Sequence, residues 1–393
     1  MEKVRLGDVC DILNGYAFKS DKYVSDGIRI IRIANVQKGY IEDSTPVFYP
    51  DNDVLAKKYL LCENDLLISL TGNVGRVARL NKELLPAALN QRVACLRKKN
   101  SNYDMNFLFN FLNSDYFEED CISNSKGVAQ KNMSTEWLKD YEIPYFTLDE
   151  QHRIAFILDK LTDLINKRKQ QLQKLDELVK ARFVEMFGDP EINQNHWEVD
   201  TLGNYMTTLT DFSANGSYEL LDSNVVMYDE PNYAIMVRTV DLEKGELAEN
   251  VKYIDRNAYD LLSKSQLYGG ELIMNKIGSA GKIYIMPYIN KPASLGRNAF
   301  MFRFDERINM TYLYHLLSSE YGTKEIQQYV RGAVTKTITK DSTRAIKILV
   351  PPIELQNKFA TFVDEVGISK SALQKSVDKL ELLKKALMQE YFG

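Results

Sequence analysis

Two short stretches of this chain follow the same pattern. Asp65-Leu66-Leu67-Ile68-Ser69 is followed by Gly72 and by Gly75-Arg76, and Glu271-Leu272-Ile273-Met274-Asn275 is followed by Gly278 and by Gly281-Lys282. Each is an apolar run of strand length that leads into a glycine-rich turn, which indicates a buried strand and the turn after it. Both glycines recur 206 residues later, so the two stretches are copies of one strand-and-turn unit.

The repeat extends over most of the chain. Further matching stretches keep an offset of 206 residues at first and 205 later: Ile31-Arg32-Ile33-Ala34-Asn35 with Val237-Arg238-Thr239-Val240-Asp241, Pro86-Ala87-Ala88-Leu89 with Pro292-Ala293-Ser294-Leu295, Gly127 with Gly332, Gln151 with Gln356, and Phe187-Gly188 with Phe392-Gly393. A length of 393 residues also exceeds the roughly 100–200 residues of one ordinary domain. We therefore expect two similar halves, each with its own core.

Each half begins as a globular domain and ends as a long helix. Residues 1–143 and 197–349 carry short β-branched and aromatic runs broken by Gly, Pro, Asn and Asp, which predicts strands joined by turns. One helical pattern intervenes in each, at 106–117 and at 310–320. We predict an α+β fold with two mixed α/β domains at these ranges. A long helical pattern follows each domain, over 144–188 and 350–393, and residues 189–196 form a polar linker.

The two long helical patterns have apolar residues at alternating spacings of four and three, as in the seam of a coiled coil. The predicted seam residues are Leu158, Leu161, Ile165, Leu172, Leu175, Val179, Val363, Val366, Leu373, Val377, Leu380 and Leu387. The charged interruptions differ between the copies, because Arg168 aligns with Leu373 and Arg182 with Leu387. We therefore predict that the helices pair with each other as an antiparallel coiled coil with pseudo-two-fold symmetry. The alternative is that each helix packs only on its own domain.

Apolar residues remain beside the predicted seam. They are Leu164, Leu178, Leu382 and Leu383. A second apolar stripe on a paired helix favours a bundle that includes another protein.

The composition limits the possible functions. Lys and Arg number 50 against 54 Asp and Glu, a net charge of −4, whereas a non-specific binder of polyanions is expected to be basic. No apolar run is long enough for a membrane helix and the start lacks a signal-peptide pattern, so we expect a cytoplasmic protein.

The cysteines can be interpreted from the repeat. Cys62, Cys95 and Cys121 align with apolar or aromatic residues in the second copy, which predicts buried, reduced thiols.

The chain shows no catalytic constellation. Its three histidines have no second metal ligand at helical spacing and do not recur in the repeat, so neither a metal site nor His-based catalysis is indicated. Gly278-Ser279-Ala280-Gly281-Lys282 lacks the first Gly and the final Ser or Thr of a phosphate loop. No fingerprint for S-adenosylmethionine or a dinucleotide appears. We predict a protein with no catalytic residues, no cofactor and no bound metal.

Positive charge is concentrated in loops at equivalent places in the two halves. Residues 76–99 include seven basic residues and one acid, and residues 282–303 include four basic residues and no acid. A Gly-x-x-Gly turn lets the backbone approach a phosphate that the following cation neutralises. The alternative is a plain turn between strands with a solvated cation.

Three repeated loops supply candidate contacts to DNA. Polar side chains beside cations can read base edges, with Arg on guanine and Asn or Gln on adenine. A third repeated loop, at 127–131 and 332–336, either contacts DNA or braces the start of the long helix. The candidate DNA-binding residues are Arg76, Asn90, Gln91, Arg92, Lys131, Lys282, Arg297 and Lys336.

The junctions of the chain carry a family resemblance. The central junction contains Phe187-Gly188-Asp189-Pro190, Asn193 and Trp197, each domain has a Leu-Gly pair near its start (Leu6-Gly7 and Leu202-Gly203), and each long helix follows a proline-to-glutamine stretch (Pro144 to Gln151 and Pro351 to Gln356). With its two variable domains, the chain resembles the specificity subunit of type I restriction-modification systems over essentially its whole length. One departure is that the second domain has Asn298 where the first has Arg92, with Arg297 one position earlier.

The resemblance implies a role in phage defence. Each domain would be a target recognition domain that reads one half of a split double-stranded DNA sequence. The helices would set the gap and dock two methyltransferase subunits, and restriction-translocase subunits would join the complex. Adenine methylation and ATP-dependent cleavage would belong to those partners. The alternative from another class is a coiled-coil protein scaffold with no DNA role, which leaves the repeated basic loops unexplained.

Overall fold

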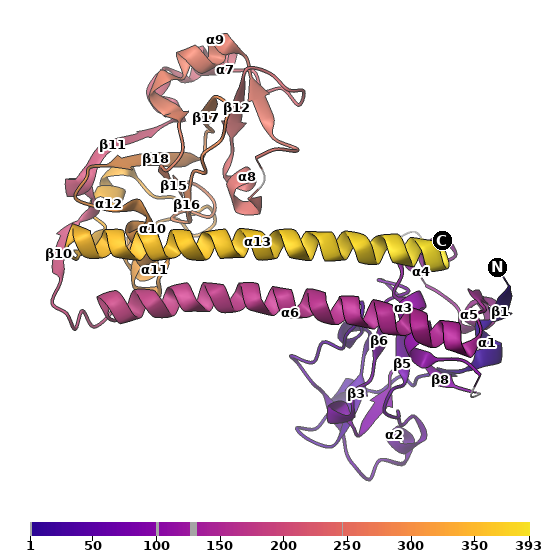
Figure 1. Cartoon of the computed structure of the whole chain (residues 1–393). Coiled ribbons are helices and arrows are strands. Elements are labelled where there is room, and N and C mark those ends of the chain that lie inside the picture. Colours follow the sequence, from indigo (N-terminus) through magenta and orange to yellow (C-terminus); the bar gives the residue numbers. More distant parts are fainter. Residues whose placement is uncertain (1, 100–101, 126–131, 246) are drawn as a thin grey trace. The chain divides into compact units, whose positions relative to one another are not determined.

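The computed structural model describes residues 2–99, 102–125, 132–245 and 247–393. They form two compact units: unit 1 consists of Met1–Gln170 with Gln374–Gly393, and unit 2 of Gln171–Leu373. The two longest helices, α6 (Leu148–Phe187) and α13 (Ile353–Phe392), have 40 residues each (Figure 1). Each of these helices contributes one end to each unit.

The domain of unit 1 consists of short strands and helices. They are β1 (Lys3–Arg5), α1 (Leu6–Val9), β2 (Cys10–Asn14), β3 (Ile28–Ile31), β4 (Phe48–Tyr49), α2 (Val54–Lys58), β5 (Leu66–Ser69), β6 (Val77–Arg79), β7 (Ala87–Leu89), β8 (Val93–Lys98), α3 (Met105–Leu112), α4 (Asp115–Ser123), α5 (Thr135–Asp140) and β9 (Glu142–Pro144). β1 and β9 pair antiparallel with Val4 opposite Ile143, so the domain ends beside its own beginning.

Two sheets share the core of this domain. One is antiparallel with the order β2-β8-β5-β6, and the other has the order β4-β3-β7 with β3 parallel to β7. In β5, Leu66 and Ile68 pack in the core that contains helix α3, whereas Leu67 packs in the core that contains β3 and β7. Burial on both faces explains why this strand is an unbroken apolar run rather than an alternating one.

Unit 2 repeats this plan. Its domain consists of β10 (Glu198–Thr201), β11 (Met206–Asp211), α7 (Tyr218–Asn224), β12 (Ala234–Val237), α8 (Thr239–Lys244), β13 (Lys252–Ile254), α9 (Arg256–Leu261), β14 (Gln266–Leu267), β15 (Leu272–Asn275), β16 (Ile283–Ile285), β17 (Ala293–Leu295), β18 (Ala299–Phe304), α10 (Met310–Ser318), α11 (Glu320–Gln327), α12 (Lys340–Arg344) and β19 (Lys347–Val350). The sheets have the orders β11-β18-β15-β16 and β13-β12-β17-β14, and β10 pairs with β19. The prediction of two mixed α/β domains, each followed by a long helix, is confirmed.

The first predicted intervening helix, 106–117, is broken between α3 and α4, which the sequence pattern did not predict. The second, 310–320, corresponds to α10, which ends at Ser318, and α11 begins at Glu320. A serine stands at each break and caps the second helix: Ser114 Oγ accepts from the backbone N–H of Phe117 (3.2 Å), and Ser319 Oγ from that of Gly322 (3.3 Å). A serine side chain satisfies an otherwise unpaired N–H at a helix start, which stabilises a new helix there.

A buried glutamine ties each long helix to the domain that precedes it. Gln151, fully buried, donates to the carbonyl oxygen of Phe146 (2.8 Å) and accepts from the backbone N–H of Asp104 (2.8 Å). Gln356 does the same with Pro351 (2.8 Å) and Asn309 (2.8 Å). We call each arrangement the glutamine clamp.

The tyrosine that donates a hydrogen bond to the end of each domain comes from a different position in the two copies. Tyr103 donates to the carbonyl oxygen of Pro144 (2.8 Å), and Tyr312 donates to that of Leu349 (2.9 Å). The two carbonyls are equivalent in the repeat, but the two tyrosines are not, because Tyr312 aligns with Phe107. The acceptor is thus kept while the donor comes from a different position.

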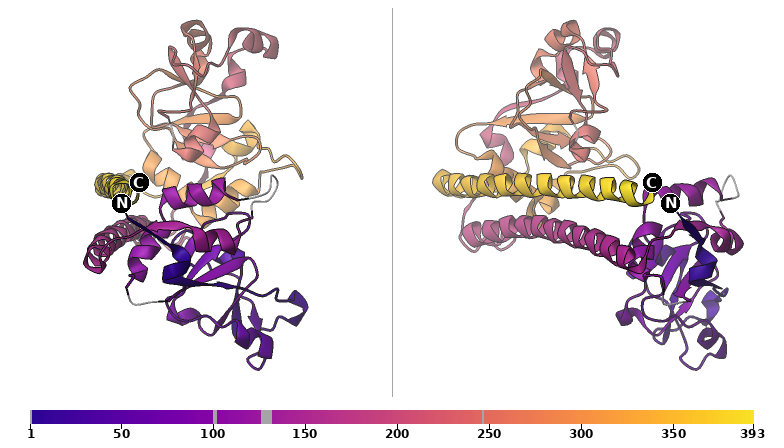
Figure 2. Two further views of the ribbon diagram at one scale, coloured as in Figure 1. Left: turned by 90° about the vertical axis from the view of Figure 1, so that its right-hand side faces the viewer. Right: turned by 45° about the vertical axis from the view of Figure 1, so that its right-hand side comes forward.

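Within each unit, the segments of α6 and α13 lie alongside each other and run in opposite directions (Figures 1 and 2). Within unit 1, Lys169 pairs with Glu381 (2.7 Å) and Lys384 Nζ donates to Thr162 (2.8 Å). Within unit 2, Lys370 pairs with Asp176, and the rings of Phe183 and Phe359 are 5.4 Å apart. Residue numbers rise along one helix as they fall along the other, which defines an antiparallel pair.

The predicted seam residues are all at least partly buried. Leu158, Leu161, Ile165, Val179, Val366 and Val377 are buried, and Leu172, Leu175, Val363, Leu373, Leu380 and Leu387 are half-buried. Leu158 also belongs to the core of the unit 1 domain, and Val179 and Val366 to that of unit 2. The ends of each helix therefore pack on a domain as well as on the other helix.

The cysteine prediction is partly wrong. Cys95 and Cys121 are buried, and burial raises the pKa of both thiols. Cys62 is exposed. Its counterpart in the repeat, Tyr268, is also 62% exposed, so this position lies at the surface in both domains and its aromatic residue was no sign of burial.

Within the described ranges, no helix is long and apolar enough to span a bilayer. The same ranges contain no cluster of three or more His, Cys, Asp or Glu side chains arranged to hold a metal ion.

Candidate nucleic-acid interface

Three segments of the unit 1 domain meet at the end of strand β5. The turn after β5 carries Arg76, the turn between β7 and β8 carries residues 90–92, and the loop after β3 carries Gln37. The backbone N–H of Leu70 donates to the carbonyl oxygen of Arg92 (3.0 Å), and Arg76 Nη1 donates to Gln37 Oε1 (2.5 Å). These contacts join the predicted basic loops into one surface, which we call the glycine-turn edge.

The unit 2 domain builds the same edge. The backbone N–H of Lys276 donates to the carbonyl oxygen of Asn298 (2.9 Å), and Lys282 pairs with Glu243 of α8. Lys282 aligns with Arg76, and Glu243 aligns with Gln37, both at the offset of 206. The glycine-turn edge of the second domain therefore consists of Glu243, Lys282 and residues 296–298.

The two glycines of each turn have different structural roles. All four have positive φ, from +72° to +88°, a region that favours glycine. A Cβ added at Gly75 would lie 2.7 Å from Cys121 Cβ, and one added at Gly281 would lie 2.5 Å from Ile326 Cγ2. A Cβ added at Gly72 or Gly278 would meet nothing within 4 Å. The second glycine of each turn is thus needed for packing against a helix, and the first faces open space.

The segment just after the third repeated loop contacts the start of the glycine turn in both domains. In the second domain the backbone N–H of Gly278 donates to the carbonyl oxygen of Lys336 (2.9 Å), and that of Ile338 donates to Lys276 (3.1 Å). In the first domain the N–H of Met133 donates to the carbonyl oxygen of Leu70 (2.8 Å). Lys131 lies outside the described residues.

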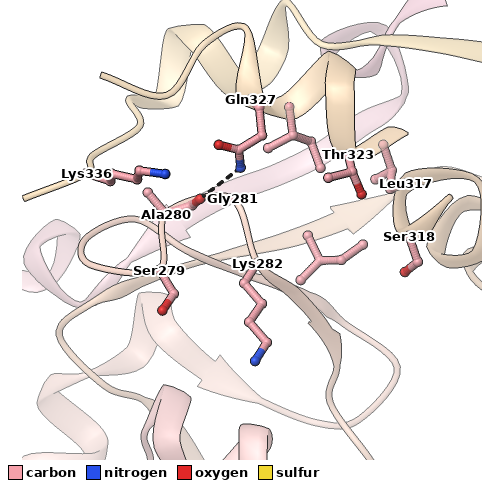
Figure 3. Close-up of a pocket in the computed structure, with 11 residues that line it drawn as sticks. Ser279, Ala280, Gly281, Lys282, Leu317, Ser318, Thr323, Gln327 and Lys336 are labelled. Atoms are coloured by element: carbon pink, nitrogen blue, oxygen red, sulfur yellow. Dashed lines mark hydrogen bonds between the residues drawn. The ribbon is translucent and has the colours of Figure 1, made fainter. Parts of the chain in front are cut away.

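A cavity of about 430 Å³ with a mixed polar and apolar lining opens beside the glycine turn of the second domain. Its lining includes Lys282 and Lys336 together with Ser279, Ser318, Thr323 and Gln327. Figure 3 shows Gln327 of α11 reaching the turn, where its side-chain amide donates to the carbonyl oxygen of Ala280 (3.5 Å). Two lysines and several hydroxyl groups are the kind of lining that suits an anionic group such as a phosphate.

The remaining candidate residues differ in how they are held. Arg297 pairs with Asp222 (3.1 Å) and its guanidinium lies over the ring of Phe212. Asn90 is half-buried, whereas Gln91 and Arg92 are exposed. Among the residues that the structure describes, the Arg92 side chain has no recorded hydrogen bond or ion pair.

The charge at the two edges is not the same. Gln37 is neutral, so the pair of Arg76 and Gln37 carries a net positive charge, whereas the pair of Lys282 and Glu243 is neutral overall. Glu243 is anionic, and its hydrogen bond to Lys282 raises the pKa of that lysine. Neither partner was predicted from the sequence, although the repeat offset that aligns Arg76 with Lys282 also aligns Gln37 with Glu243.

Comparison with known proteins identifies the family. The type I restriction modification DNA specificity domain matches residues 1–175 and 206–384. The chain belongs to this family, which makes it a DNA-recognition component of such a system and not one of its catalytic subunits. The family predicted from the junction residues is confirmed.

Several relatives match along nearly the whole chain. The EcoBI specificity subunit of Escherichia coli is 22% identical over 96% of this chain and 81% of its own length. The MjaVIII specificity subunit of Methanocaldococcus jannaschii is 23% identical over 98% of this chain and 91% of its own length. The EcoAI specificity subunit of Escherichia coli is 36% identical, but over 43% of this chain and 29% of that protein.

Solved structures share the fold. The S subunit of a type I restriction-modification system from M. genitalium aligns with a TM-score of 0.59 at 17% identity, covering 100% of this chain and 96% of that one. A chain from a structural description of complex assembly and conformational transition in a type I system aligns with a TM-score of 0.57 at 17% identity, covering 100% and 97%.

Proposed function

We propose that this chain determines which DNA sequence a type I restriction-modification complex recognises. Each domain reads one half of a bipartite double-stranded sequence, and α6 with α13 sets the unread gap. The observation that carries the proposal is the duplicated glycine-turn edge, in which the cation after the turn and its partner occupy equivalent positions in both domains. Two similar polar edges on one chain suit two half-sites.

The long helices support the role of a spacer. Ile154 of α6 packs in the core of the unit 1 domain and Phe187 of the same helix in that of unit 2, while α13 packs with Phe359 in unit 2 and Phe392 in unit 1. A helix of 40 residues is about 60 Å long at about 1.5 Å per residue. On DNA that length corresponds to roughly 18 base pairs at about 3.4 Å each, enough for two half-sites with an unread gap between them.

Exposed leucines on the paired helices support docking of partner proteins. Leu164 and Leu178 of α6 are 45% and 47% exposed, and Leu382 and Leu383 of α13 are 70% and 47% exposed. We infer that two methyltransferase subunits cover these residues and that restriction-translocase subunits join the assembled complex. Leu382→Glu should weaken co-purification with the methyltransferase, whereas Val54→Glu, at an equally exposed position (72%) on α2, should not.

Sequencing of methylated adenines tests the reading of DNA. Host DNA should carry a split methylated target that depends on this gene, and replacing residues 1–143 by the domain of another family member should change one half of it. A change in both halves contradicts independent reading. Methylation that does not depend on the gene contradicts the proposed function.

Deletion of one heptad tests the spacer. Removing residues 161–167, from Leu161 to Lys167, shortens α6 by two turns and should shorten the gap or abolish methylation. An unchanged target with an unchanged gap contradicts the spacer model.

A further inference from the structure

Arg297 of the second domain lies between two surface depressions. Each is about 280 Å³ in volume, and Arg297 and Asn298 line both. The guanidinium of Arg297 lies 5.1 Å from the ring centroid of Phe212 and 6.0 Å from that of Tyr218, and Asp222 pairs with it from a third side. Stacking and ion pairing fix the plane of an arginine fork, which prepares it for recognition through two parallel hydrogen bonds.

One of the two depressions has an apolar lining. It is lined by Phe212, Val225, Met227, Met236 and Val240, with Arg238, Thr239, Gly296, Arg297 and Asn298. Two of its apolar side chains face solvent over much of their surface, Met227 at 45% and Val240 at 48% exposed. We call this depression the apolar pocket.

The neighbouring groups indicate what the apolar pocket binds. In the major groove of DNA, guanine offers two acceptors that match an arginine fork, and thymine is marked by its C5-methyl group. A fixed arginine next to an apolar surface therefore has the two chemistries needed to read adjacent base pairs of these kinds. Burying one methyl group in such a pocket is favourable by the hydrophobic effect.

We propose that the second domain recognises a guanine next to a thymine, with Arg297 on the guanine and the thymine C5-methyl in the apolar pocket against Met227 and Val240. The inference rests on the proposed function and names part of the target. The guanidinium donates to guanine O6 and N7 while Asp222 holds it from behind.

The first domain lacks this arrangement. Gln91 aligns with Arg297, and Ala34 aligns with Val240. The residues that anchor Arg297 lie between β11 and β12, where residues 212–233 include α7, whereas the equivalent connection in the first domain is the shorter segment 15–27. The half-site read by the first domain is therefore a control within the same molecule.

The experiment uses the complete complex with its methyltransferase subunits and the target found by sequencing methylated adenines. Each thymine of the target is replaced in turn by deoxyuridine, which removes only the C5-methyl group. We expect binding to weaken about three- to fivefold at one thymine next to a guanine in the second domain's half. In the first domain's half, any loss of binding caused by the same replacement should be unaffected by substitution of Val240.

A matched pair of variants assigns the effect to the apolar pocket. Val240→Ser should bring thymine and deoxyuridine targets to nearly equal affinity. Val226→Ser changes a valine of similar exposure (51%) that does not line the pocket, and should keep the difference. Both positions lie at the surface, so folding should be retained, which thermal unfolding of each variant checks.

Two results would overturn the inference. One is a second half-site with no guanine next to a thymine, and the other is unchanged binding for every deoxyuridine target. A host without any gene-dependent target would overturn the proposed function as well, whereas a defined target with unchanged deoxyuridine binding overturns only this inference.

Discussion

The glycine-turn edges of the two domains have the same backbone and different electrostatics. Both use a glycine turn with positive φ, both place a cation after it, and in both that cation contacts a residue of the segment that follows an equivalent strand. The first domain pairs Arg76 with the neutral Gln37, and the second pairs Lys282 with the anionic Glu243. The backbone of the turn and the charge of the residue that pairs with its cation thus vary independently, so one scaffold can present different surfaces to DNA.

The shared frame is tested most strongly at the second glycine of each turn. Gly281→Ala should reduce the free energy of unfolding by about 3 kcal/mol, because it combines left-handed backbone strain with a new clash against α11. Gly278→Ala adds the strain alone, since its Cβ would meet nothing within 4 Å, and should cost about 1–2 kcal/mol. Urea denaturation of the full chain measures both.

The corresponding pair in the first domain provides the control. Gly75→Ala and Gly72→Ala should show the same order, because a Cβ at Gly75 would lie 2.7 Å from Cys121 Cβ and one at Gly72 would be free. Equal losses for the two glycines of one turn would mean that only conformation, and not packing, requires them.

The two domains should differ in acid stability. His315 of α10 is replaced by Asn110 in the equivalent helix α3. Burial, together with the positive charge of nearby Lys370, lowers the pKa of His315 to about 4. Because the folded-state pKa is below the unfolded value of about 6.5, stability is present above pH 6.5 and is lost as the pH falls toward 4, by about 2 kcal/mol at pH 5.

Hydrogen exchange of peptides from α10 and α3 checks this difference. On lowering the pH from 7.5 to 5, and after correction for the intrinsic rate, protection of α10 should fall by more than that of α3. His315→Asn should remove the part of this loss that depends on His315. If α10 of that variant loses as much protection as the original chain, another group is responsible.

The charge difference between the edges should appear in the salt dependence of DNA binding. Arg76→Ala should reduce the slope of log K against log salt by about 0.9, the value for one phosphate contact. Lys282→Ala should reduce it less, because Glu243 already neutralises that lysine. The assembled complex on its own target is the sample for these measurements.

Exchanging the residues at positions 37 and 243 should reverse the difference in salt dependence between the two edges. Glu243→Gln should raise the contribution of Lys282, and Gln37→Glu should lower that of Arg76. Slopes that stay the same in both exchanges would show that neither cation touches a phosphate and that the turns serve only the fold.

Much of the architecture can be predicted because the sequence is periodic. The repeat offset gives two domains, the apolar run at residues 66–68 gives a strand buried on both faces, and the four–three spacing gives the paired helices. The break at Ser114 was missed, because apolar spacing continues across a capped break.

The binding surface was less predictable. Its charges depend on contacts between residues far apart in the chain, such as Arg76 with Gln37. The anchors of Arg297 lie in residues 212–233, a connection longer than its counterpart at 15–27, so the repeat could not indicate Phe212 or Asp222. The exposure of Cys62 was missed because an aromatic counterpart can lie at the surface.

The glutamine clamp has a consequence for the angular setting of the long helices. Gln151 and Gln356 are fully buried, and each side-chain amide makes hydrogen bonds through both its oxygen and its nitrogen. These bonds fix the rotation of each helix about its own axis relative to the domain that precedes it. Each residue added to such a helix beyond the clamp turns everything after it by about 100°, whereas seven residues return it to within about 20° of the original direction. Natural or designed changes in helix length should therefore be tolerated in steps of whole heptads. A single-residue change should turn the far end of the helix so that its apolar face no longer points at the domain on which that end packs.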